Sequence, residues 1–219
     1  LQEEGSNCLL KTLEEPPPGS VLILVGTSEQ RQLPTIRSRS QIVRFRPLSI
    51  QQTLEVLKRI EPMVAASELE ELARSSGGSV VQALQLQDSE LRQFRQQLFK
   101  RLSASPLDFV ELAKAVSGLA ERVGKDAAAA KRDRLKIVFQ FGEQFYKQLL
   151  LVLEGQGDPC DETLDRESTN GAKVFRGGRT GALACWQRSL AASEEVDRFV
   201  NQQTLVEAWA SDLARFANA

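Results

Sequence analysis

The residues best suited to chemistry lie in one short basic segment, Arg37, Ser38, Arg39 and Ser40. An arginine side chain is planar, permanently charged and able to donate two parallel hydrogen bonds, which suits it to the oxygens of a phosphoryl group. The two arginines would look the same if they were ordinary solvated residues in a basic turn. The residue types alone leave both interpretations open.

A second candidate is Thr27, which follows Gly26 and the apolar run at 21–25. Its hydroxyl could position a water molecule beside a bound phosphate. It could equally bond to nearby backbone at the end of a strand. No GxxxxGK[ST] sequence occurs in the chain, so no phosphate-cradling loop of that kind is expected.

Other residue groupings do not suggest catalysis. Glu14 and Glu15 are neighbours at a helix end, and adjacent helical side chains do not converge on one site. The chain has no histidine, and Cys8, Cys160 and Cys185 are far apart. Neither a zinc site nor a disulfide framework is expected. We therefore predict no metal, no cofactor and no enzyme activity of the chain by itself.

The overall composition is that of an ordinary globular protein. Of the 219 residues, 42% are hydrophobic, and the formal net charge is −1. A near-neutral balance gives no global attraction to nucleic acid or to membranes, and no apolar run approaches the roughly 20 residues of a membrane span. Three separate thiols without a framework favour a cytoplasmic protein.

The elements that would position Thr27 and Arg39 form half of an α/β sheet domain. A helix is predicted over 1–15 and is ended by the prolines at 16–18, which cannot continue it. A buried strand is predicted over 21–27, a helical turn over 34–38 and a final strand over 41–45. Half a sheet would leave apolar faces uncovered.

From residue 48 the pattern changes to amphipathic helices. Three short helices are predicted between 48 and 90, with start signals at Ser49 with Gln52, Ser67 with Glu70, and Ser79 with Gln82. Longer helices are predicted over 89–102, after Ser105, Pro106 and Asp108, and over 126–154, about 182–199 and about 202–217. The intervening residues 156–181 are rich in Gly, Asp, Arg and Thr and are predicted to form a long, partly mobile loop.

Two further groups on these helices are given structural interpretations. Trp186, Trp209 and the helically spaced phenylalanines are expected in a core or an interface. Several basic residues could contact a DNA backbone, but they are interleaved with acids, and a solvated face is the better interpretation. They are Arg92, Arg95, Lys100, Arg101, Lys131, Arg132, Arg134 and Lys136.

The order NCLLKTLEEPPP, VLILVGTSEQRQLPTIRSRS resembles the AAA+ module of clamp-loader subunits of the bacterial DNA polymerase III. The resemblance is dense over residues 7–48, weaker over 49–90 and thin beyond. It places the family's sensor-one position at Thr27 and its SRC motif at Ser38-Arg39-Ser40, with the arginine kept and the cysteine replaced by Ser40. It implies that Arg39 is an arginine finger acting on a neighbouring subunit, and it identifies the chain as a C-terminal fragment.

What the resemblance implies for the architecture is a mainly α protein. Residues 1–47 would be the last part of an AAA+ α/β core, 48–90 a three-helix lid and 91–219 a helical collar. The expected partners are other clamp-loader subunits, through the collar and the AAA+ interface, with the sliding clamp and primed DNA in the same complex. No membrane is expected among them.

Within the family, the resemblance favours a subunit that does not hydrolyse ATP. The sensor-two position matches Val81, whose aliphatic side chain cannot pair with a phosphate, and this favours a structural role for Thr27. The alternative is an active ATPase subunit of the gamma/tau type whose ATP-binding half is missing here. A third interpretation is an unrelated helical scaffold with a chance match near its start.

Overall fold

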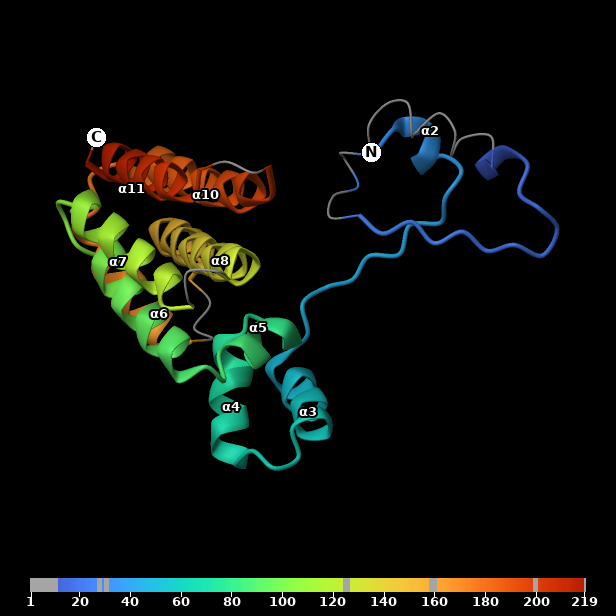
Figure 1. Ribbon diagram of the computed structural model, residues 1–219, viewed down its shortest axis with the longest axis horizontal. Coiled ribbons are helices and arrows are strands. Elements are labelled where there is room, and N and C mark those ends of the chain that lie inside the picture. The colour runs from blue at the N-terminus through green and yellow to red at the C-terminus, as the bar shows by residue number, and fades with distance from the viewer. Residues whose placement is uncertain are drawn as a thin grey trace. The chain divides into compact units, whose positions relative to one another are not determined.

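The computed structural model describes residues 12–26, 29, 32–123, 127–157, 161–198 and 201–218 (Figure 1). The chain divides into two compact units, Leu1–Arg46 and Pro47–Ala219. The regular structure of the described residues is helical, and they contain no β-strand. The predicted mainly α fold class is confirmed.

The first unit contains a short helix, α2 (Pro34–Arg37), where a helical turn was predicted over 34–38. Residues 12–14 are also helical, whereas 1–11 of the predicted N-terminal helix lie outside the described part of the chain. Proline occupies the first position of α2, where its missing N–H and fixed φ are tolerated.

The two predicted strands of this unit are not formed. Residues 21–26 and 41–45 have no regular secondary structure. A strand needs a neighbour to pair its backbone groups, and none lies alongside within the described residues. The side chains of Val21, Val25 and Phe45 are consequently 85%, 95% and 94% exposed. The apolar pattern marks segments suited to a covered sheet, and the described residues supply no such sheet.

The second unit begins with three short helices, α3 (Ile50–Ile60), α4 (Ala66–Ser75) and α5 (Val80–Gln85). The predicted capping box at the start of α3 is present. The Ser49 hydroxyl accepts a hydrogen bond from the Gln52 backbone, and the Gln52 side chain accepts one from the Ser49 backbone at 3.0 Å. Ser79 caps α5 in the predicted manner.

The start of α4 was predicted wrongly. The helix begins at Ala66, one residue before Ser67, and Ala65 at the cap makes no side-chain hydrogen bond. Its end agrees with the sequence, since Gly77 and Gly78 follow with positive φ angles of 57° and 82°. The backbone of Leu48 donates to the Gly78 carbonyl at 3.1 Å, and a Cβ at position 78 would clash with Leu48. Glycine therefore allows the chain entering α3 to pass close to the end of α4.

The longer helices are α6 (Ser89–Leu102), α7 (Phe109–Glu121) and α8 (Ala128–Leu153). Asp88 caps α6 and Asp108 caps α7, each accepting hydrogen bonds from two backbone N–H groups. Pro106 is not the first residue of α7, contrary to the sequence interpretation, because the chain turns into the helix only at Asp108.

The prediction of a long loop over 156–181 is wrong. Most of it forms α9 (Glu162–Ala172) and the first turn of α10 (Gly178–Glu195). Asp161 caps α9 by accepting hydrogen bonds from the backbone of Thr163 and Leu164 at 3.0 and 3.2 Å. Only one large apolar side chain of α9 is buried, Leu164, and the other buried residues are the small Ser168 and Gly171. Such a helix carries almost no apolar periodicity.

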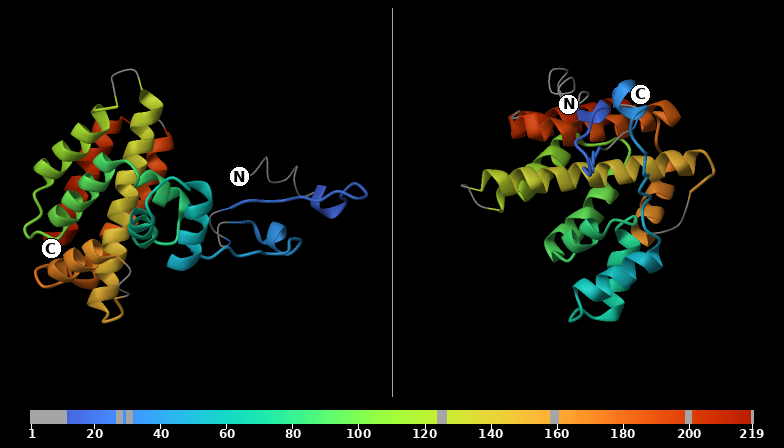
Figure 2. Two further views of the ribbon diagram at one scale, coloured as in Figure 1. Left: turned by 90° about the horizontal axis from the view of Figure 1, so that it is seen from below. Right: turned by 90° about the vertical axis from the view of Figure 1, so that its right-hand side faces the viewer.

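The chain ends with a 3-10 turn, η1 (Val196–Arg198), and α11 (Gln202–Asn218). The side chain of Asn201 accepts hydrogen bonds from the backbone of Gln203 and Thr204, which satisfies two N–H groups in the first turn of α11. In the helical unit, α8 packs against α6, α7, α9 and α10, and α11 packs against α7 and α10 (Figure 2).

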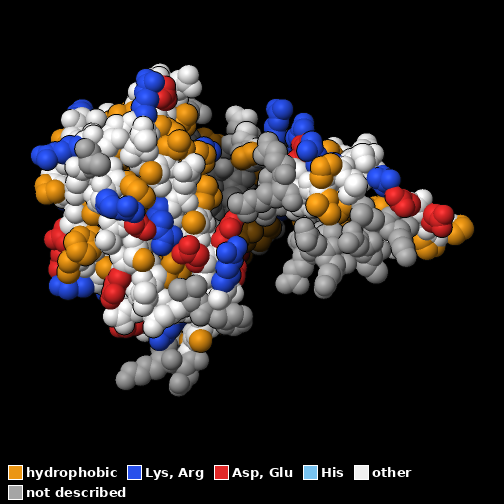
Figure 3. Space-filling model, turned by 90° about the horizontal axis from the view of Figure 1, so that it is seen from above, with side chains coloured by type: hydrophobic (Ala, Val, Ile, Leu, Met, Phe, Trp, Pro, Cys, Tyr) orange, Lys and Arg blue, Asp and Glu red, His pale blue; other side chains and the backbone are white. Residues whose placement is uncertain are grey.

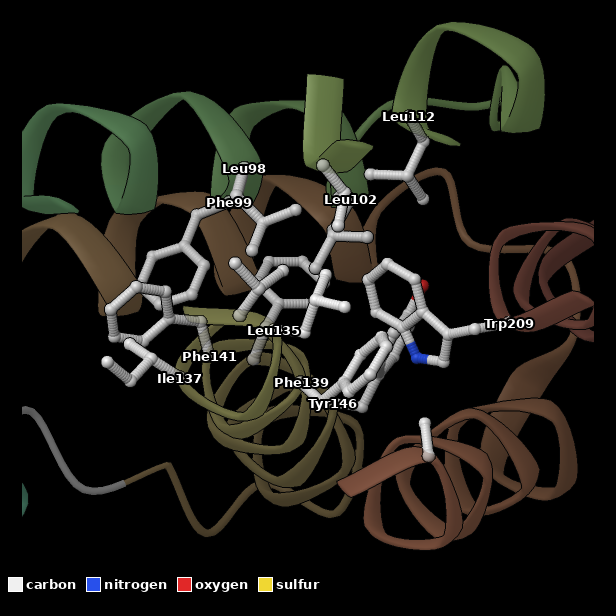
Figure 4. Packing of buried hydrophobic residues seen from close by; sticks show 14 of the residues in the cluster. Leu98, Phe99, Leu102, Leu112, Leu135, Ile137, Phe139, Phe141, Tyr146 and Trp209 are labelled. Carbon is white, nitrogen blue, oxygen red and sulfur yellow. The ribbon is translucent and has the colours of Figure 1, made fainter. Parts of the chain in front are cut away.

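The core of the helical unit is centred on α8. Phe139 of α8 packs edge-on against Trp209 of α11, with ring centroids 5.1 Å apart, and both are fully buried (Figure 4). The Trp209 indole N–H donates to the Ser189 hydroxyl of α10 at 3.1 Å, so its polar atom is satisfied. The prediction that Trp209 belongs to a core or an interface is confirmed.

No helix in the described part of the chain is long and apolar enough to cross a membrane.

Candidate functional site

The short helix α2 determines where Arg39 lies. Ile36 is 3% exposed and anchors the turn, while its neighbours on the helix remain open to solvent. The Arg39 backbone N–H donates to the Ile36 carbonyl at 3.2 Å, so the helical turn continues just past the end of α2. Arg39 is therefore held at the end of an ordered turn and not on a free loop.

The guanidinium of Arg39 makes exchangeable contacts. It forms an ion pair with Glu14 at 2.8 Å, and the two side chains are 38% and 51% exposed. It also donates to the Thr35 carbonyl at 3.2 Å. Exposed ion pairs of this kind contribute about 0–1 kcal/mol. An incoming phosphate could displace Glu14 at little cost, because a bidentate arginine–phosphate pair is the stronger interaction.

Two more arginines of this unit share a second carboxylate. Arg37 and Arg44 pair with Glu29 at 3.0 and 2.7 Å. The hydrogen bond from Arg44 is the main reason why the pKa of Glu29 lies below its usual value, and the charges of Arg44 and Arg37 act in the same direction. Arg37 and Arg39 are thus paired with different acids, Glu29 and Glu14.

The structure assigns Glu14 a role that the sequence did not suggest. Adjacency to Glu15 argued correctly against a pair of catalytic carboxylates, but it gave no sign that Glu14 lies beside Arg39. The two residues are separated by the turn at the prolines and by residues 21–33. No local spacing rule connects positions that far apart. The indication in the sequence is only that Glu14 and Arg39 carry opposite charges within one predicted unit.

The other predicted site residues add no further contacts to the site around Arg39. Thr27 lies outside the described residues. Val81 is 65% exposed on α5 and offers no group that could bind a phosphate. Among the described residues, no cluster of three or more His, Cys, Asp or Glu side chains could hold a metal ion. Cys185 is a buried free thiol, and Cys8 and Cys160 lie outside the described part of the chain.

The basic residues on the later helices do not form one solvated face. Acidic and basic side chains are interspersed on the face shown in Figure 3. Arg134 pairs with Asp88 at 3.2 Å and also pairs with Glu90. The interpretation fails for Arg95, which is only 4% exposed and points into the helical unit. A buried arginine requires a built set of partners, and no sequence pattern marked this one.

A mainly helical chain with an exposed arginine at the end of a short turn after LEEPP fits the class of clamp-loader subunits. Comparison with known proteins supports this class. Residues 1–49 match the family model described as "DNA polymerase III, delta subunit". The chain is also 40% identical over 112 residues to the DNA polymerase III subunit delta' of Pseudomonas aeruginosa.

The matched region covers 47% of this chain and 34% of that relative, so the chain spans about a third of the relative's length. The two matches confirm the resemblance predicted from the sequence. The particular protein that the chain is similar to is a delta-prime subunit of DNA polymerase III.

Proposed function

We propose that the chain belongs to a clamp-loader subunit of the replicative DNA polymerase that does not hydrolyse ATP itself. It assembles with other loader subunits and presents Arg39 to the nucleotide site of a neighbouring ATPase subunit. There the guanidinium neutralises charge that develops on the transferring phosphoryl group. The result is ATP turnover coupled to placing a sliding clamp on primed DNA.

The observation that carries this proposal is the state of Arg39. The side chain is ordered by the turn after α2, exposed, and paired only with surface groups of low cost. An arginine that acts on a partner's nucleotide must be accessible, and it must be able to leave its own contacts. Arg39 meets both requirements, and the resemblance of Ser38-Arg39-Ser40 to the family's SRC motif supports a trans-acting role for it.

The proposed lack of hydrolysis by the chain itself rests on Val81. A residue that senses bound nucleotide from α5 must donate hydrogen bonds to phosphate, and an exposed valine cannot. Thr27 then has no phosphate-bound water to position and is proposed to have a structural role. The subunit is proposed to work in the cytoplasm, with its contacts to other subunits made through residues 91–219 and through the unit that carries Arg39.

The test is Arg39→Ala in the complete protein, assembled with its partner subunits. We expect normal folding and assembly, since exposed substitutions away from caps usually change stability by about 0.5 kcal/mol or less. DNA-stimulated ATP turnover should fall, because arginine fingers contribute on the order of 10³ or more to the rate at one site. A loader has several sites, so total turnover should fall partially and clamp loading more.

Two matched variants sharpen this test. Arg37→Ala removes an equally charged, exposed arginine two positions earlier that pairs with Glu29, and it should leave turnover unchanged. Arg39→Lys keeps the charge without the planar fork and should rescue poorly. Unchanged turnover and loading in an assembled Arg39→Ala complex would make Arg39 an ordinary surface residue.

A further inference from the structure

Arg95 of α6 is held in a nearly closed pocket of partners. Its guanidinium forms an ion pair with Asp161 at 2.6 Å, and both side chains are only 5% exposed. Its carbon Cζ lies 4.4 Å from the ring centroid of Phe99 and 5.7 Å from that of Phe141. Arginine suits such a site because its charge is delocalised, weakly hydrated and able to stack on aromatic rings.

The same guanidinium also bonds to α4, the second of the three short helices α3–α5. It donates to the Ser75 carbonyl, at the last residue of α4, at 3.4 Å, and to the Gln144 side chain of α8 at 3.3 Å. Gln144 in turn donates to Gln82 of α5 at 2.8 Å. One partly buried polar network thus joins α4 and α5 to α6, to α8 and, through Asp161, to the N-terminal cap of α9.

Apolar contacts also cross this junction, since Leu86 and Leu91 belong to one continuous core. Apolar burial is non-directional and sets no unique orientation between two packed bodies. A buried charge is different, because removing one partner leaves the other charge desolvated and unpaired. The hydrogen bond from Arg95 to the Ser75 carbonyl and the bond from Gln144 to Gln82 are the directional contacts that constrain α4 and α5 relative to α6 and α8.

We propose that Arg95 is an orientation lock, which holds the three helices α3–α5 in one position against the bundle α6–α11. Most of the buried apolar residues lie in the bundle, and the lock decides how α3–α5 are presented. Arg95 and Asp161 both belong to the bundle, so it is loss of the Arg95 guanidinium, with its bond to the Ser75 carbonyl, that releases α3–α5 to sample other orientations while the bundle stays folded. This inference does not depend on the role proposed for Arg39.

The variants are chosen so that folding survives. Asp161→Asn removes the charge but keeps an N-cap residue for α9, because asparagine caps as well as aspartate. Arg95→Met removes the guanidinium and keeps an apolar stem against Phe99. The double variant removes both charges of this ion pair together, so neither Arg95 nor Asp161 is left buried without the other. The matched control is Arg92→Met, which removes the more exposed bridge from Arg92 to Glu68 at 3.0 Å.

The measurement is the distance distribution between two spin labels in the full chain by pulsed electron resonance. Labels at Glu70 of α4 and Gln187 of α10 occupy exposed positions, with the three native cysteines replaced by serine or alanine. We expect one narrow distribution without the lock variants and with Arg92→Met. In the double variant we expect that single narrow peak to be lost, while the thermal unfolding of the bundle remains cooperative.

Three results would overturn the proposal. A double variant with the same narrow distribution would show that apolar packing alone fixes α3–α5. A broad distribution before any change at Arg95 would show that there is no lock to release. Loss of cooperative unfolding in the double variant would also refute it, because Arg95 would then support the bundle itself.

Discussion

Gly142, in the middle of α8, provides a sharp test of how tightly the helical unit is packed. A Cβ built on Gly142 would lie 2.9 Å from Cζ2 of Trp209 and 3.1 Å from the Ser189 hydroxyl. Trp209 is fully buried and its indole N–H is bound to that same hydroxyl. The ring therefore has little freedom to move away, and Gly142→Ala must displace α8, α10 or α11.

Two opposing effects set the size of the change. Replacing a mid-helix glycine by alanine favours the helix by about 1 kcal/mol. Forcing a methyl group into a filled core costs about 1–3 kcal/mol. We expect packing to win at Gly142, with a net loss of roughly 1 kcal/mol in the free energy of unfolding.

Gly118 of α7 supplies the matched control. A Cβ there would meet nothing within 4 Å, so only the helix propensity changes. Gly118→Ala should therefore stabilise the same bundle by up to about 1 kcal/mol. The two substitutions are chemically identical and should have opposite signs.

Thermal unfolding followed by far-ultraviolet circular dichroism is the assay. For a protein of this size, 1 kcal/mol corresponds to a shift of about 2–4 °C in Tm. Gly142→Ala should lower Tm and Gly118→Ala should raise it. If Gly142→Ala raised Tm as much as Gly118→Ala, the close approach of α8 to Trp209 would be wrong.

Two other predictions concern stability in the same unit. Burial raises the pKa of Cys185 to about 12, so the folded thiol keeps a proton that the unfolded thiol loses above about pH 8.5. The free energy of unfolding should then fall as pH rises from about 9 towards 12, by up to about 1.4 kcal/mol per pH unit. Urea unfolding of Cys185→Ala should show a shallower fall with pH. Equal slopes for Cys185→Ala and the unsubstituted chain would contradict this. Asn201→Ala should cost about 1 kcal/mol by removing the cap of α11, whereas Asn201→Asp should cost little in the same assay, and equal losses would mean that the cap is not formed.

Local signals explain what the sequence could predict. The capping box of Ser49 with Gln52 and the cap at Ser79 depend on groups within three residues of each other, so their sequence spacing is sufficient evidence. The helical turn at α2 follows from Pro34 in the same way. The long helix α8 was visible because its apolar residues recur at helical spacing over seven turns.

Features built from distant residues were not predictable in this way. The helix α9 buries small residues against α6, and Gly171 lies where a Cβ would be 3.3 Å from the Cα of Ser103. Close packing of that kind requires small side chains, which removes the apolar signal by which helices are recognised. Arg95 was grouped with solvated basic residues because its partner Asp161 is 66 positions away along the chain.

The exposed apolar segments of the first unit also depend on residues far away in the sequence. Residues 21–25 have the composition of a fully covered strand, yet Val21, Ile23 and Val25 are each more than 80% exposed. Composition reports the environment for which a segment is suited, whereas exposure reports the neighbours it has among the described residues. The turn that bears Arg39 begins at Pro34 and is closed by backbone hydrogen bonds that span three or four residues, so it forms without strand pairing in the described residues. Its order therefore depends on short-range contacts, and the neighbouring apolar segments depend on long-range ones.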